Sequence, residues 1–142
     1  MKLDEIDILA RTIYGEARGE YARVDGGLGG LIAVGNVVMN RLKTQSRFGK
    51  TLGEVCQKPY QFSCWNEKDP NQRILKQNLM GDPMFQLCLE VARRLYAQEW
   101  PDLTKGSDHY HAKTMPALPP WAMGHTPRFC IGQHIFYSLK KG

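Results

Sequence analysis

The spacing of apolar residues changes along this 142-residue chain, and that change constrains the fold more than any other feature. Up to about residue 100, apolar residues recur at steps of three and four, the period of an amphipathic α-helix. The best-defined stripe follows Asp82-Pro83, an N-cap with proline at the first helical position, and it contains Phe85, Cys88, Leu89, Ala92, Leu95 and Tyr96. Beyond Pro101, short aromatic and β-branched runs are typical of strands. We expect an α+β fold, mainly α, with a small β element towards the C-terminus.

Other segments carry the signals that begin and end helices. We expect a first helix from Asp4 to a stop near Gly19, a second over about 29–42, a short one at Thr51-x-x-Glu54 that ends near Cys56, and another after Asp69-Pro70. The glycines before and inside the second helix match no phosphate-binding loop, so close helix packing explains them better. Extended segments are expected at 109–111 and 129–137, on either side of a proline-rich loop.

Length and charge bound the class of protein. A chain of 142 residues suits one domain, 1–142, and is too short for two comfortable ones. The net charge of +5 favours polyanionic partners such as nucleic acid, anionic lipid or a cell-wall polymer. The basic residues are scattered, however, and no nucleic-acid-binding motif is present, so we expect no nucleic-acid partner. No apolar run approaches the roughly 20 residues of a membrane span, and we expect a monomer.

The cysteines and the N-terminus bear on the cellular compartment. Cys56, Cys64, Cys88 and Cys130 match no zinc-ribbon or C-x-x-C pattern, and Cys88 lies in a predicted apolar stripe. We therefore expect four free thiols made in a reducing compartment. The first residues lack the apolar run of a signal peptide. This leads us to expect synthesis in the cytoplasm.

Two sequence blocks are more specific than the rest of the chain. The first is Tyr14-Gly15-Glu16-Ala17-Arg18-Gly19-Glu20, followed by the helix that carries Asn36, Asn40 and Arg41. The second is Ile131-Gly132-Gln133-His134-Ile135-Phe136, and Tyr60-Gln61-Phe62-Ser63, Tyr110 and Trp121 lie between the two. In this order and spacing the chain resembles the cell-wall hydrolase family that includes the spore-cortex-lytic enzymes of germination and related phage endolysins. The resemblance extends over about 8–137.

That resemblance implies a lysozyme-like fold and cleavage of peptidoglycan glycan strands, typically by lytic transglycosylation, with Glu16 as the catalytic residue. Partial burial at the wall of a cleft would disfavour the charged form of a carboxyl group. A protonated carboxylic acid can then donate to the glycosidic oxygen. Hydrolysis usually needs a second carboxylate, for which Glu20 is nearest and Asp25, Glu54, Glu67 and Asp69 are weaker candidates. Because none stands out, transglycosylation fits better than the alternative, a hydrolytic muramidase. Neither route needs a metal or another cofactor. With no signal peptide, the resemblance implies action on the wall after release, as in phage lysis, or as a virion-associated lysin.

Sugar-binding clefts use aromatic faces for stacking and polar side chains for hydrogen bonds. The expected substrate-binding residues are Tyr14, Glu20, Tyr60, Gln61, Phe62, Ser63, Tyr110 and Trp121. For Phe62 and Trp121, a place in the core is an equal alternative. Asn36, Asn40 and Arg41 would orient Glu16 or a loop, or play a purely structural part. The chain has His111-Ala112 after Tyr110, where the spore enzymes tend to have Tyr-Asn, so no role is carried over from that asparagine.

Two rival classes remain open at this point. His109-x-His111 and Cys130-x-x-x-His134 would supply four ligands to a zinc ion, which would suggest a wall amidase. The spacing matches no recognised zinc site. A polyanion-binding module without activity is the second rival, and it rests on the net charge alone.

Overall fold

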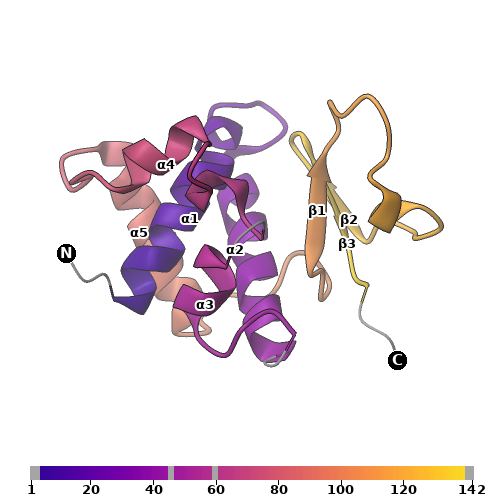
Figure 1. Ribbon diagram of the computed structural model, residues 1–142, viewed down its shortest axis with the longest axis horizontal. Coiled ribbons are helices and arrows are strands. Elements are labelled where there is room, and N and C mark those ends of the chain that lie inside the picture. The colour runs from indigo at the N-terminus through magenta and orange to yellow at the C-terminus, as the bar shows by residue number, and fades with distance from the viewer. Residues whose placement is uncertain (1–3, 45–46, 59–60, 140–142) are drawn as a thin grey trace.

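The computed structural model describes residues 4–44, 47–58 and 61–139. Helices fill the first part of the chain and a small sheet fills the last, as Figure 1 shows. The helices are α1 (Glu5–Tyr21), α2 (Gly27–Thr44), α3 (Leu52–Gln57), α4 (Pro70–Leu75) and α5 (Pro83–Tyr96), with short 3-10 turns η1 (Ser63–Trp65) and η2 (Pro120–Ala122). The expected mainly-α fold with a C-terminal β element is confirmed.

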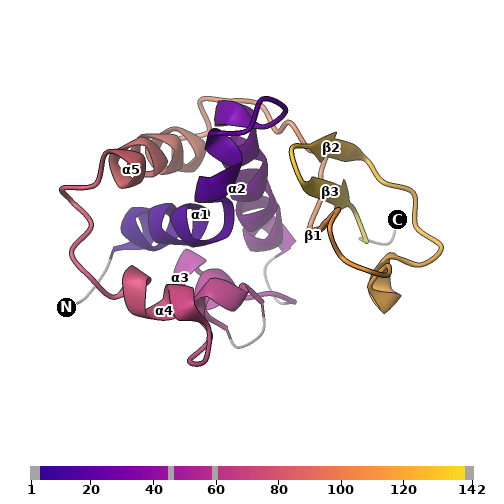
Figure 2. The ribbon, with the colours of Figure 1, turned by 90° about the horizontal axis from the view of Figure 1, so that it is seen from above.

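Helix α1 is the centre of the helical part, because α2, α3 and α5 all pack against it, and Figure 2 shows them around it. Leu9 and Ile13 of α1 belong to the same buried core as Leu31 and Val34 of α2. Gly35 lies where α2 approaches α5 and α1, and a Cβ at this position would overlap the side chain of Leu95. Close helix packing therefore explains this glycine, as the sequence indicated.

The sheet has three antiparallel strands, β1 (His109–Ala112), β2 (Phe129–Ile131) and β3 (His134–Tyr137), in the order β1-β3-β2. In the register of the sheet, Phe136 pairs with Tyr110 on one side and Phe129 on the other. The segment 129–137 was expected to be one extended run and is instead a hairpin. Gly132 turns the chain with a φ of +55°, a conformation that favours glycine.

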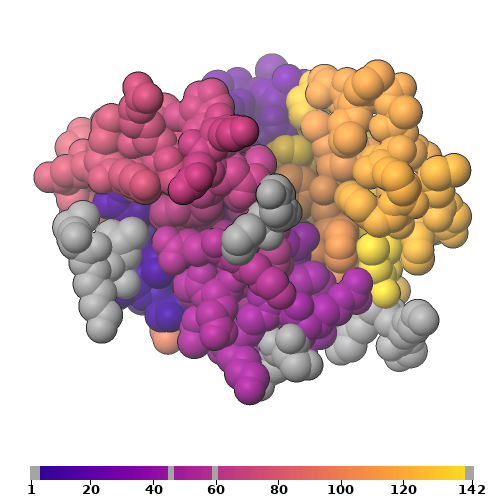
Figure 3. All heavy atoms as spheres, viewed as in Figure 1, coloured from indigo at the N-terminus to yellow at the C-terminus, as the bar shows by residue number. Residues whose placement is uncertain are grey.

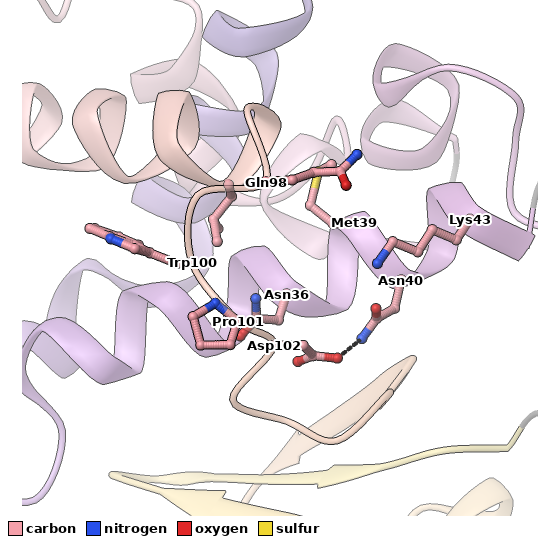
Figure 4. A pocket seen from close by; sticks show the side chains of 9 residues that line it. Asn36, Met39, Asn40, Lys43, Gln98, Trp100, Pro101 and Asp102 are labelled. Atoms are coloured by element: carbon pink, nitrogen blue, oxygen red, sulfur yellow. Dashed lines mark hydrogen bonds between the residues drawn. The ribbon is translucent and has the colours of Figure 1, made fainter.

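Polar side chains of α2 hold the segment that leads into β1. The Asn40 side-chain amide donates to Asp102 Oδ2 at 2.8 Å, seen in Figure 4, and to the backbone carbonyl of Ser107 at 2.9 Å. Arg41 Nε donates to the carbonyl of Asp108 at 2.7 Å. These bonds fix the start of β1 on the helical part. A pocket of about 230 Å³ lies beside the Asn40–Asp102 bond and contains neither Glu16 nor a strand residue.

The N-caps agree with the sequence signals, and the helix ends depart from them. The side chains of Asp4, Thr51, Asp69 and Asp82 accept hydrogen bonds from backbone amides at the starts of α1, α3, α4 and α5. Gly19 does not end α1, which continues to Tyr21; a glycine inside a helix lowers stability without forcing a stop. The second helix begins two residues earlier than expected, at Gly27. None of the helices in the described ranges has the length and apolar character needed to cross a membrane.

The four cysteines are free thiols, and only one of them is exposed: Cys130 lies at the surface, whereas Cys56, Cys64 and Cys88 are buried. Burial raises the pKa of the Cys56 and Cys88 thiols to about 12 and also raises that of Cys64. Since the thiolate is the reactive form, we expect dithionitrobenzoate to modify one cysteine in the folded protein and four after denaturation. Rapid reaction of two or more thiols in the native protein would contradict this packing.

Candidate active site

Glu16 lies where the helical part meets the sheet, and each of its carboxylate oxygens has a donor from a different part of the fold. The Tyr110 hydroxyl on β1 donates to Oε1. The backbone N–H of Cys64 in η1 donates to Oε2 at 3.2 Å. The Ser63 hydroxyl is 3.5 Å from the same oxygen, at the outer limit of a hydrogen bond. The carboxyl group is thus fixed in position while its side chain stays partly exposed.

The close approach of η1 to α1 depends on Gly15. A Cβ at this position would lie 2.7 Å from Cys64 Cβ and 2.9 Å from Cys64 Sγ, closer than side chains tolerate. Trp65 adds a second attachment, because its indole N–H donates to the Thr12 hydroxyl at 2.8 Å. Together these contacts bring the Cys64 amide to Glu16, the residue next to Gly15.

Tyr110 reaches Glu16 because β1 is held against α2. Burial of the Tyr110 hydroxyl raises its pKa well above the usual value, and the neighbouring charge of Glu16 adds to the effect. The hydroxyl therefore keeps its proton at any physiological pH and acts as a donor. Arg41 lines the same pocket as Tyr110; burial lowers the pKa of its guanidinium, and the charge of Asp108 opposes that shift.

Glu20 occupies a cradle of glycines one turn beyond Glu16. Its side chain is only 10% exposed, and Oε1 accepts a hydrogen bond of 2.6 Å from the backbone amide of Gln133. A Cβ on Gly132 would overlap this carboxylate, and one on Gly30 would lie 2.9 Å from the Cβ of Glu20. Glu20 thus attaches the β2–β3 turn to α1. This placement favours a structural part for Glu20 over the substrate contact expected from the sequence.

His134 lies between Glu20 and Tyr110. Its ring is 4.8 Å from the Tyr110 ring, and Nδ1 is 3.8 Å from Glu20 Oε1. Burial lowers the pKa of His134, while the carboxylate of Glu20 opposes the shift. Nδ1 is buried and has no hydrogen-bond partner among the described residues. The imidazole therefore serves chiefly as a packing surface behind Tyr110.

A pocket of about 380 Å³ adjoins this site and shares Tyr110 with it. Its lining combines cationic and amide side chains, Arg41, Arg47, Lys58 and Gln61, with aromatic rings, Phe48, His109, Tyr110 and Trp121. In Figure 3 the surface is hollowed where the magenta helical segments meet the orange strand segment. A groove with aromatic and polar walls beside a fixed carboxyl group suits a sugar polymer.

Comparison with known proteins agrees with this arrangement. A family model described as Cell Wall Hydrolase matches residues 26–137, most of the chain. The chain belongs to the cell wall hydrolase family. The matched range begins after Glu16, so the place of Glu16 in the site rests on the contacts described above. No curated protein sequence gives a significant match.

Two solved structures share the fold of this cell wall hydrolase. The catalytic domain of the SleB protein of Bacillus cereus is 24% identical, with a TM-score of 0.65, and the match covers 94% of this chain and 89% of that one. The catalytic domain of SleB from Bacillus anthracis, titled a germination-specific lytic transglycosylase, is 23% identical, with a TM-score of 0.65, and 97% of each chain is covered. At these identities the likeness establishes the fold.

The structure brings some of the expected substrate-binding residues to the groove and places others elsewhere. Gln61, Tyr110 and Trp121 line the pocket, and the exposed Ser63 is beside Glu16. Tyr14 is buried, packs on Phe85, and donates to Asp82 at the start of α5. Phe62 is 1% exposed and belongs to the core. Neither residue forms a wall of the groove, and Tyr60 lies outside the described residues.

Sequence reasoning missed three groups that build the site. The Cys64 amide is a backbone donor and leaves no trace in side-chain patterns. Arg47 and Lys58 come from segments without a motif, and only the fold brings them to the pocket. Gly15 belongs to the motif around Glu16, yet its role depends on Cys64 nearly 50 residues away.

The rival zinc site gains no support from the geometry. Within 4–44, 47–58 and 61–139, no three or more His, Cys, Asp or Glu side chains are arranged to hold a metal ion. His111 Nε2 is 3.0 Å from the Tyr137 hydroxyl, the His109 ring lies against Trp121, and Cys130 is exposed on β2. The four residues of the zinc alternative therefore do not converge.

Removal of the Tyr110 hydroxyl tests its contact with Glu16. We expect Tyr110→Phe to lower turnover on peptidoglycan by about 10-fold, because Glu16 loses one of the two donors that position it. Tyr137→Phe is a matched control, since its hydroxyl contacts His111 and not Glu16. The control is expected to stay within about twofold of wild type. Equal turnover by both variants and wild type would show that the tyrosine contact is dispensable.

The buried carboxylate of Glu20 should matter for stability. We expect Glu20→Gln to lower the free energy of unfolding by about 1–2 kcal/mol, because a charged acceptor for the Gln133 amide becomes a neutral one. Asp25→Asn removes the same charge from an exposed ion pair with Arg23, where solvent screens the interaction, and should cost clearly less. Urea unfolding of both variants measures the difference, and an equal cost would refute the structural assignment of Glu20.

Proposed function

We propose that this protein is a lytic transglycosylase that cuts the β-1,4 bond between N-acetylmuramic acid and N-acetylglucosamine, with Glu16 as the general acid and base. The proposal rests on the observation that two donors hold the carboxyl group of Glu16: the Tyr110 hydroxyl from the sheet and the Cys64 backbone amide from η1. Membership of the cell wall hydrolase family supports peptidoglycan as the substrate.

In the first half of the reaction, protonated Glu16 gives its proton to the glycosidic oxygen. The bond from that oxygen to C1 of the muramoyl residue breaks, and C1 gains oxocarbenium character. In the second half, the C6 hydroxyl of the same sugar attacks C1 and returns its proton to Glu16. The products are a 1,6-anhydromuramoyl end and a free 4-hydroxyl on the departing glucosamine. Glu16 is regenerated and no water is consumed.

The surroundings of Glu16 favour this route over hydrolysis, the alternative that uses a second carboxylate about 5–9.5 Å away. Four of the five candidate acids are engaged elsewhere: Glu20 binds the Gln133 amide, Asp25 pairs with Arg23, Glu54 accepts from the Lys50 amide, and Asp69 caps α4. The fifth, Glu67, is exposed and does not line the pocket beside Glu16. The pocket beside Glu16 has no acidic residue in its lining. A single carboxyl group serves both steps of a transglycosylation.

Mass spectrometry of digested peptidoglycan tests the proposal. We expect fragments that end in 1,6-anhydromuramic acid, with a mass 18 Da below the hydrated products. Reducing muramic acid ends would replace the proposal by the muramidase alternative. Freed stem peptides with intact glycan strands would show an amidase and reject glycan cleavage altogether.

A further inference from the structure

Three cationic side chains line the pocket beside Glu16, and the pocket contains no acid of its own. Arg41, Arg47 and Lys58 contribute the positive charges. Across the described ranges, neither Arg47 nor Lys58 takes part in an ion pair. The Arg47 guanidinium lies over the Phe48 ring, 5.1 Å from its centre, and this contact leaves its charge uncompensated. The pocket is therefore suited to an anionic ligand.

The fold holds the charge of Arg41 in a fixed position. It is 7% exposed, and its guanidinium lies 4.7 Å from the centre of the Phe62 ring and 5.0 Å from that of Phe48. Its Nε donates to a backbone carbonyl, and Nη1 donates to Gln61 Oε1 at 3.2 Å. A charge held this far from water gains most from an opposite charge that approaches it.

The same pocket also offers stacking surfaces. Tyr110 and Trp121 line it, and the His109 ring packs 4.9 Å from the Trp121 ring. Aromatic faces suit the C–H patches of a pyranose ring, and guanidinium and ammonium groups suit a carboxylate. The combination fits a sugar that carries an anionic substituent.

We propose that this pocket binds a carboxylate of the peptide stem on muramic acid, so that the enzyme prefers peptide-bearing strands to peptide-free ones. The proposal rests on the proposed function, because the stem is attached to the sugar whose bond Glu16 would break. A stem carboxylate therefore enters the groove together with the scissile bond. Phosphate groups of other wall polymers lack this fixed relation to the bond, and a carboxylate is the better match.

Binding of a soluble fragment tests the proposal without any turnover. Calorimetry compares a muramoyl peptide that has free carboxylates with the same molecule after conversion of its carboxylates to amides. We expect the free acid to bind wild type at least about 10-fold more tightly, as for a charge-assisted contact. In Arg47→Gln/Lys58→Gln this preference should fall to about twofold or less. In Lys76→Gln/Arg93→Gln, which loses the same charge just after α4 and on α5, the preference should persist.

Equal affinity of wild type for the two ligands, binding of neither, or an unchanged preference in Arg47→Gln/Lys58→Gln would each overturn the proposal. Stronger displacement of the muramoyl peptide by a glycerol-phosphate polymer than by free stem peptide would instead assign the pocket to phosphate. Cleavage gives an independent readout. Wild type should cut peptide-bearing strands faster than strands stripped by an amidase, and equal rates would reject the pocket assignment alone. Failure to cut either substrate would reject the proposed function and leave the binding result standing.

Discussion

Glu16→Gln is expected to lose at least about 100-fold in the rate of peptidoglycan cleavage while the protein remains folded. An amide has nearly the same shape as the carboxyl group but cannot transfer a proton, and loss of a general acid typically costs 10²–10⁴-fold. The amide oxygen can still accept from Tyr110 or Cys64, so the packing around position 16 has little reason to change. The measurement is release of soluble fragments from purified walls, with circular dichroism as the check on folding.

Glu67→Gln provides the matched control for that experiment. Glu67 is an exposed acid between η1 and α4, so the substitution removes the same charge a short way along the chain. It should retain activity within about twofold. A folded Glu16→Gln protein with near-normal turnover would remove Glu16 from the mechanism, whereas equal losses in the two variants would indicate a general charge effect.

Gly15→Ala is expected to lower turnover by roughly 10- to 100-fold although it adds a single methyl group. The new Cβ would press on Cys64, whose own Cβ is fixed to the backbone of η1, and η1 must move away. The Cys64 amide would then leave Glu16, and a displacement of about 1 Å at a catalytic group can cost 10²-fold. Overpacking of about 1–3 kcal/mol would be partly offset by the better helix propensity of alanine, about 1 kcal/mol.

Gly19→Ala, on the same helix, separates the effect of helix propensity from the effect of overpacking. A Cβ at Gly19 meets nothing within 4 Å, so this substitution changes helix propensity without a new contact. It should raise the free energy of unfolding by up to about 1 kcal/mol. If Gly15→Ala were stabilised to the same extent and kept wild-type turnover, the close contact of η1 with α1 would not be required for activity.

The helices could be predicted well because their signals are local. Asp82-Pro83 and the stripe from Phe85 to Tyr96 give the start and the buried face of α5. The structure has both, except that Tyr96 at the end of the stripe is exposed. The turn at Gly132 could not be placed, because a run of apolar and aromatic residues reads as one strand until its pairing partner is known. The continuation of α1 past Gly19 is a similar case, since contacts elsewhere outweigh the propensity of one residue.

For the residues of the site, more of the prediction depends on contacts that only the fold provides. Tyr14 and Glu16 are two residues apart on a helix and therefore point about 200° apart, so helical geometry alone could have excluded Tyr14 from the groove. Glu20 is one turn from Glu16 and does share its face. Only the β2–β3 turn, more than 100 residues later in the chain, shows that Glu20 is covered. The Cys64 amide and the cationic pocket likewise depend on contacts between distant segments.

The most direct test of the account is a crystal structure of Glu16→Gln with a bound peptidoglycan oligosaccharide. We predict that the glycan lies in the groove between the helical part and the sheet, with a sugar ring against Tyr110 or Trp121. The side chain at position 16 should lie within about 3.2 Å of the glycosidic oxygen between a muramic acid and the glucosamine that leaves. An oligosaccharide bound at another surface, or in the groove with position 16 out of hydrogen-bond reach of any glycosidic oxygen, would contradict it.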